Sequence, residues 1–231
     1  MEIPFQASSD YPSAAAFDSN KPDKPDSVLR VQCLIVDQVA DENGMGINPR
    51  SKDRKLNWPI MKDWARVAGV NLHDYARAAG LSLSDNSDEE DEESDREFVN
   101  QKPERMYFNG DSLHHAFFSS MRRGLYGTNP SHNTTSETEL DRKKVLEVEI
   151  SMEGDWVFFR SPRGYMGLAD SRALPTDCVC VLLGASVPFV LRRQENHYLL
   201  IGEAYVHGLM YGEAIEMMRS GSLEVKTIDI Y

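Results

Sequence analysis

The sequence has few cysteines, no long apolar run and no basic cluster. Each of these three features argues against one class of protein. Three cysteines in 231 residues are too few and too badly spaced for a disulfide framework, so free thiols in a reducing compartment are expected. No apolar run approaches the roughly 20 residues that cross a bilayer. The first 26 residues have neither the basic start nor the apolar core of a secretory signal. We therefore expect a cytoplasmic protein with no membrane contact.

The net charge of −12 comes mostly from one segment. Residues 85–97, with the sequence DNSDEEDEESDRE, hold nine acids and one arginine, which gives −8 and leaves −4 for the rest of the chain. Basic residues elsewhere gather only in short pairs such as Arg122-Arg123. A nucleic-acid-binding protein is expected to present a basic patch, so the sequence argues against nucleic acid as a partner.

Residue patterning divides the chain into three stretches. Residues 1–27 are rich in Ser, Pro, Asp and Ala without periodicity, which predicts a flexible lead-in. Residues 28–144 contain a strand-like stretch (28–39), helical patterns and an acidic loop (84–100) whose like charges predict disorder. In residues 145–231, short strand-like segments alternate with turn residues. We predict an α+β fold whose C-terminal part is a small β-barrel of about six or seven short, mainly antiparallel strands, which the 28–39 strand is a candidate to join.

Helices are expected beside the barrel. Residues 58–79 carry apolar side chains at helical spacing, with a break near Gly69. A second helix is expected within residues 110–127, where Asp111 or Ser112 can cap the start. We expect one or two further helical turns after residue 208, between the last two strands.

The charged residues Glu203, His207 and Glu213 allow two interpretations. On a helix, Glu203 and His207 would share a face, and Glu213 could complete a metal triad. Residues 198–206 read better as a strand, however, where positions i and i+4 stand about 13 Å apart. A structural role, with Gly208 allowing a sharp turn, is therefore favoured. A metal-dependent hydrolase that uses the three side chains is the alternative.

Four short motifs occur in order between residues 158 and 214. They are Phe158-Phe159 followed by Gly164-Tyr165-Met166-Gly167-Leu168; Asp177 at the head of a Val-rich strand; Pro-Phe-Val-Leu-Arg ending at Arg192; and Gly-Glu-Ala-Tyr-Val-His-Gly (202–208) followed by Gly-Glu-Ala (212–214). Together they resemble the C-terminal barrel region of fungal heterokaryon-incompatibility proteins, the HET-domain family. Thr176 and Tyr211 depart from the family's pattern, which usually has glycine and an acid at these positions.

The resemblance implies action through protein contacts. Family members commonly begin with a TIR-like HET domain associated with cell death when genetically different hyphae fuse, and residues 1–150 lack the alternating strands and helices of such a module. The resemblance therefore implies a non-catalytic regulatory or recognition module of nonself recognition. It also implies a protein partner, for example a HET domain in cis or in trans. No catalytic residue, cofactor or metal is expected.

The resemblance also points to residues with structural roles. Gly164, Tyr165, Gly167 and Leu168 are expected in a tight strand turn. Arg192, Glu203 and His207 are expected as a buried or half-buried polar set, with an Arg192–Glu203 ion pair across neighbouring strands. The remaining positions of interest are Asp177, Gly208 and Glu213.

Overall fold

The computed structural model describes residues 7, 28–41, 43–46, 58–72, 106–121 and 156–231. The predicted acidic loop (84–100), the predicted boundary at residues 144/145 and all of the lead-in except Ala7 lie outside the described residues. The described elements are, in chain order, β1 (Leu29–Gln38), α1 (Trp58–Ala68), α4 (Leu113–Met121), β2 (Trp156–Arg160), β3 (Met166–Asp170), β4 (Cys178–Leu182), β5 (Phe189–Arg193), β6 (Tyr198–Val206), α6 (Glu213–Arg219) and β7 (Val225–Ile230).

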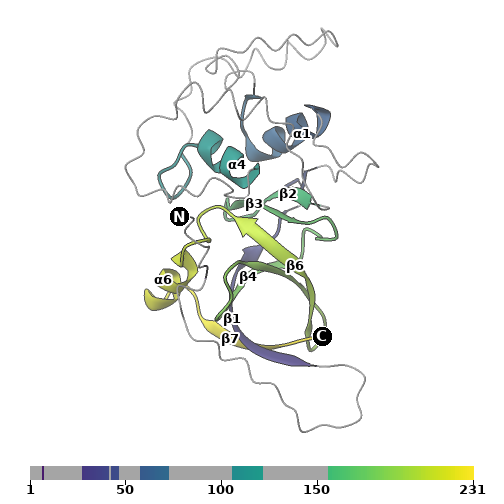
Figure 1. The fold of residues 1–231 in the computed structure, drawn as a ribbon, viewed down its shortest axis with the longest axis vertical. Helices are drawn as coiled ribbons and strands as arrows, with labels where there is room; N and C mark the ends of the chain where they lie inside the picture. The colour runs from purple at the N-terminus through teal and green to yellow at the C-terminus, as the bar shows by residue number, and fades with distance from the viewer. Residues whose placement is uncertain (1–6, 8–27, 42, 47–57, 73–105, 122–155) are drawn as a thin grey trace.

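The seven described strands form one sheet that closes on itself. Their order is β2-β3-β6-β5-β4-β1-β7, and β7 also pairs with β6 through Tyr198 and Ile230. This last pairing is parallel and all the others are antiparallel, so five strands form the ring visible in the lower half of Figure 1. The predicted α+β fold with a small barrel is confirmed. The 28–39 strand joins the barrel as β1, between β4 and β7.

The middle residues of β1, β2, β3 and β4 are buried on both faces of the sheet, whereas β7 starts with three exposed residues. Successive side chains of a strand point to opposite faces, so each of these strands contributes to two layers. One face of β1 and β4 contributes Cys33 and Cys180 to an apolar cluster that also draws on β5 and β7. The opposite face contributes Leu34 and Val181 to a larger cluster with residues of β2, β3, β6 and α6. These two layers explain why β4 reads as a continuous apolar run rather than an alternating one.

The helices α1 and α4 cover the part of the sheet formed by β2 and β3, at the opposite end of the molecule from the ring (Figure 1). Trp64 of α1 stacks on Phe158 of β2, and Phe117 of α4 packs edge-on against the same ring. Gly69, with a φ of 75°, follows the end of α1 at the predicted break. Among the described helices, none has the length and apolarity needed to cross a membrane.

Of the four residues expected in a tight turn, Gly164 and Tyr165 lie in the β2–β3 turn, whereas Gly167 and Leu168 lie in β3 itself. Gly164 has a φ of 93°, which favours glycine, and its N–H donates to the Ser161 carbonyl at 2.8 Å. Gly167 lies in β3, directly opposite Phe159 of β2. A Cβ atom on Gly167 would overlap the carbonyl oxygen of Tyr205 and lie 2.9 Å from the Phe159 ring. Only a residue without a side chain therefore lets these three strands approach so closely.

Candidate functional site

His207 follows the last residue of β6, and its side chain contacts both the segment that precedes α4 and β6 itself. Its Nε2 atom lies 2.8 Å from Oδ2 of Asp111, a residue 96 positions earlier in the chain. Its Nδ1 atom lies 3.4 Å from the hydroxyl of Tyr205. The His207 side chain is only 6% exposed, whereas that of Asp111 is 23% exposed. The contact therefore joins a buried imidazole to a carboxylate that reaches the surface.

His115 brings a second imidazole to this pair. One ligand atom from each of Asp111, His115 and His207 lies within 4.8 Å of the other two. Ser112 fixes the start of α4, because its Oγ accepts the His115 N–H at 3.1 Å, as the capping pattern predicts. Neighbouring helical side chains diverge by about 100°. The adjacent His114 accordingly contacts a different group, the carbonyl of Asn71, at 3.4 Å.

The surroundings favour the ionised form of Asp111. The hydrogen bond from His207 lowers the pKa of the Asp111 carboxyl below its usual range. Partial burial opposes this effect, and the Asn109 amide, which donates to Oδ2 at 2.7 Å, adds to it. The carboxylate is therefore charged near neutral pH. A charged carboxylate beside two imidazoles is a donor set that suits a divalent metal ion such as zinc.

Tyr107 ties the segment that carries Asp111 to the barrel. Its hydroxyl donates to the His207 carbonyl oxygen at 3.0 Å and accepts the Met166 N–H at the same distance. Burial raises the pKa of Tyr107 well above its usual range, so the hydroxyl stays protonated. This single group satisfies two main-chain groups at the adjoining ends of β3 and β6.

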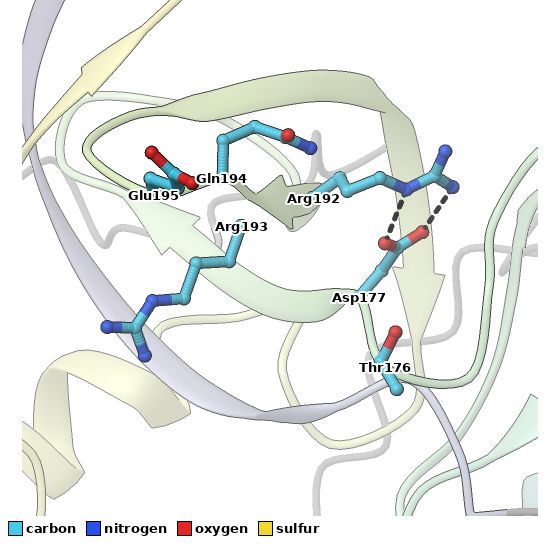
Figure 2. A pocket seen from close by; sticks show the side chains of 6 residues that line it. All are labelled: Thr176, Asp177, Arg192, Arg193, Gln194 and Glu195. Carbon is cyan, nitrogen blue, oxygen red and sulfur yellow. Dashed lines mark hydrogen bonds and ion pairs between the residues drawn. The ribbon is translucent and has the colours of Figure 1, made fainter.

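A second polar site lies where β4 begins, and Figure 2 shows its two charged side chains pointing toward one another. Arg192 contacts Asp177 through two bonds, Nε to Oδ1 at 2.8 Å and Nη2 to Oδ2 at 2.9 Å. The same Oδ2 accepts the Leu174 N–H at 2.8 Å, and Nη2 also donates to the Arg172 carbonyl at 2.8 Å. The hydrogen bond to Asp177 raises the pKa of Arg192.

A cavity of about 440 Å³ adjoins this ion pair. Its lining consists of Thr176, Asp177, Arg192, Arg193, Gln194 and Glu195. Arg193 points away from the pair in Figure 2, so the two arginines do not converge on one ligand. Asp177 and Arg192 are therefore engaged with each other and with the main chain.

The predicted Arg192–Glu203 pair is wrong. In the register of β5 and β6, Glu203 lies opposite Phe189, whereas Arg192 lies opposite Leu199. Glu203 is also exposed, so only Arg192 and His207 of the predicted polar set are buried or half-buried. Asp177 takes the place of Glu203 because the turn before β4 brings its carboxylate under the guanidinium.

The alternative site of Glu203, His207 and Glu213 is wrong in its ligands. All three residues are described, but they do not form a group with converging ligand atoms. Glu213 begins α6 and accepts the Tyr211 N–H at 2.7 Å. Sequence reasoning missed Asp111 and His115, the true neighbours of His207. The i, i+4 spacing of these two residues across a helix start was the only local signal.

Comparison with known proteins supports the resemblance seen in the motifs. Residues 129–222 match the Het-6 beta-barrel domain. A 66-residue stretch is 39% identical to heterokaryon incompatibility protein 6, OR allele, of Neurospora crassa. That alignment covers 27% of this chain and 10% of the relative, so the chain spans about a tenth of the relative's length. No solved structure matches the chain.

The two polar sites differ in their relation to the residues that match the Het-6 beta-barrel domain. Asp177 and Arg192 both lie within the matched residues 129–222, so both partners of this ion pair belong to the matched stretch. The histidine cluster instead crosses the boundary of the match, because His207 lies inside it while Asp111 and His115 precede it.

Proposed function

We propose that the chain is a non-catalytic recognition module in fungal heterokaryon incompatibility and that it acts through contacts with another protein. The observation that carries this proposal is the match of residues 129–222 to the Het-6 beta-barrel domain. The 39% identity to a protein named for heterokaryon incompatibility supports the same role.

The use made of the motif residues also supports a non-catalytic role. Gly164 and Gly167 meet conformational and packing needs of the β2–β3 hairpin. Asp177 is 1% exposed, and both of its oxygens are occupied by Arg192 and the Leu174 N–H. These residues hold strands and turns in place, so their polar atoms are bonded within the protein and do not face a substrate.

The segment before α4 offers a surface suited to a protein partner. Met106 and Phe108 are 63% and 56% exposed, although both are large apolar residues. The Phe108 ring packs edge-on against Tyr165 at 4.7 Å between centroids, so it has a defined position. The two residues are two positions apart in the chain, and neighbouring exposed apolar residues commonly mark protein contacts. We propose that the partner, such as a HET domain in cis or in trans, contacts this Met106–Phe108 surface.

A competition experiment in a fungus that shows heterokaryon incompatibility tests this proposal. The chain is overexpressed in hyphae that then fuse with an incompatible strain, and the frequency of cell death in fused cells is scored by dye uptake. If the chain binds a component of the incompatibility response, the free chain should reduce this frequency. An unchanged frequency at confirmed high expression would contradict the proposal.

A matched pair of variants tests the surface. Phe108→Ser should abolish the effect of overexpression, because it removes the apolar ring at the proposed contact. Leu200→Ser changes a comparably exposed apolar residue on β6 and should leave the effect intact. Equal effects of the two variants would contradict a role for the Met106–Phe108 surface.

A further inference from the structure

We propose that Asp111, His115 and His207 bind one divalent cation of the zinc class. This inference does not depend on the proposed recognition function. Its basis is the convergence of one carboxylate oxygen and two imidazole nitrogens within 4.8 Å of one another. The Asp111 Oδ2 and His207 Nε2 atoms are already 2.8 Å apart, so small side-chain movements suffice to place all three around one ion.

The donor set is suited to a borderline metal ion. Neutral imidazoles and carboxylates are preferred zinc ligands at bond lengths of about 2.0–2.2 Å, whereas calcium and magnesium prefer sites made of oxygen atoms alone. Three protein ligands leave one tetrahedral position for water or for a group from another molecule.

Each proposed ligand has a polar neighbour that restrains it. The Tyr205 hydroxyl lies 3.4 Å from Nδ1 of His207, on the side of the ring opposite Nε2. The Ser119 hydroxyl lies 3.4 Å from Nε2 of His115. The Asn109 amide donates to Asp111, as described above. Such outer partners orient metal ligands in proteins, and their loss typically lowers metal affinity about 10–100-fold.

The cluster has one buried side and one side that solvent can reach. His207 is almost completely buried, while Asp111 and His115 are partly exposed. An ion can therefore enter from the side of Asp111 and His115 and come to rest against His207. Bound there, the ion would link α4 and the segment before it to the end of β6. The Tyr107 hydroxyl already joins the segment before α4 to His207 and to Met166 at the start of β3.

Metal titration of the whole chain tests the proposal. The protein is purified with any polyhistidine tag removed, stripped with EDTA and titrated with Zn²⁺ in competition with a chelating dye. We expect one ion per chain and a rise in the melting temperature of about 5 °C at saturating zinc. Failure to bind a stoichiometric ion would overturn the proposal.

Two ligand variants and one matched control locate the ion. His115→Gln and Asp111→Asn should each weaken zinc binding by at least about tenfold, since the loss of an outer partner alone costs that much. His114→Gln changes the adjacent histidine of the same helix, whose ring contacts Asn71 instead, and should bind zinc like the wild type. Wild-type affinity in His115→Gln would overturn the assignment.

X-ray absorption at the zinc edge provides a test that needs no variant. In the wild-type protein we expect the scattering of two imidazoles and no sulfur. Sulfur ligation would mean that the ion is held by cysteine, and ligation by oxygen alone would mean that the histidines take no part. Either result would overturn the proposal even if the ligand variants failed to fold.

Discussion

The ion pair between Asp177 and Arg192 should respond asymmetrically to mutation, because its two charges are buried to different extents. The Asp177 side chain is 1% exposed and the Arg192 side chain is 29% exposed. Arg192→Met leaves a buried carboxylate for which one donor remains among the described residues, the Leu174 N–H at 2.8 Å. Removing one partner of a buried pair costs about 3–5 kcal/mol. Because that donor remains, we expect the lower end, a loss of about 3 kcal/mol in the free energy of unfolding.

Asp177→Asn should cost less. The substitution keeps the shape of the side chain and leaves the unpaired charge on Arg192, which water can reach. The guanidinium also keeps its hydrogen bond to the Arg172 carbonyl at 2.8 Å. The loss should therefore be close to that of one charged hydrogen bond, about 1.5 kcal/mol. The double variant should lose less than the sum of the two single losses, by at least about 1 kcal/mol.

Urea unfolding at pH 7, followed by tryptophan fluorescence, measures these losses. Glu203→Gln is the control, because Glu203 is exposed and has no part in the pair, and it should change the free energy of unfolding by less than about 0.5 kcal/mol. A loss below about 1 kcal/mol in Arg192→Met, or a larger loss in Asp177→Asn than in Arg192→Met, would refute the proposed asymmetry of the pair.

Three further predictions concern the packed interior. Gly167→Ala should lower the free energy of unfolding by about 3 kcal/mol, because the new Cβ atom would meet the main chain. Gly164→Ala has open space around its Cβ atom and should lower it by only about 1–2 kcal/mol, because of the positive φ. Equal losses of the two variants in urea unfolding would contradict this difference. Tyr107→Phe should cost about 1–3 kcal/mol by leaving two buried main-chain groups without their partner, and a loss below 0.5 kcal/mol would show that they find other partners. Burial raises the pKa of the Cys33 thiol to about 11, so at pH 8 Cys33 should resist iodoacetamide in the native protein and react in urea. The half-buried Cys178 should react before Cys33 in the native protein. Mass spectrometry of the labelled peptides gives the order, and faster labelling of Cys33 than of Cys178 would contradict the prediction.

Much of the fold could be predicted from local patterns. The β-branched run of β1 and the short strands from β2 to β7 have a composition that only suits a sheet, and glycine and proline mark the turns between them. Ser112 at the start of α4 and Gly69 after α1 act on their own neighbours, so the start of α4 and the break after α1 were also predictable. These features depend on interactions within a few residues, which a sequence displays directly.

The candidate sites could be predicted only in part. The motifs drew attention to Asp177, Arg192 and His207, and all three are engaged in polar contacts. Their partners were missed, because a strand pattern fixes which residues share a face but not the register between strands. Asp111 and His115 in turn belong to a helix start whose local pattern signals capping and not ligation.

The sequence by itself determined a small barrel with helices beside it, since alternation, turn residues and caps are local properties of the chain. Only the tertiary structure decided which charges meet. Arg192 pairs with a residue 15 positions away, and His207 pairs with one 96 positions away. Strand register and the packing of α4 on β3 bring these residues, which are far apart in the sequence, into contact. Register and helix packing follow from the summed burial of many apolar side chains, so no short segment encodes them.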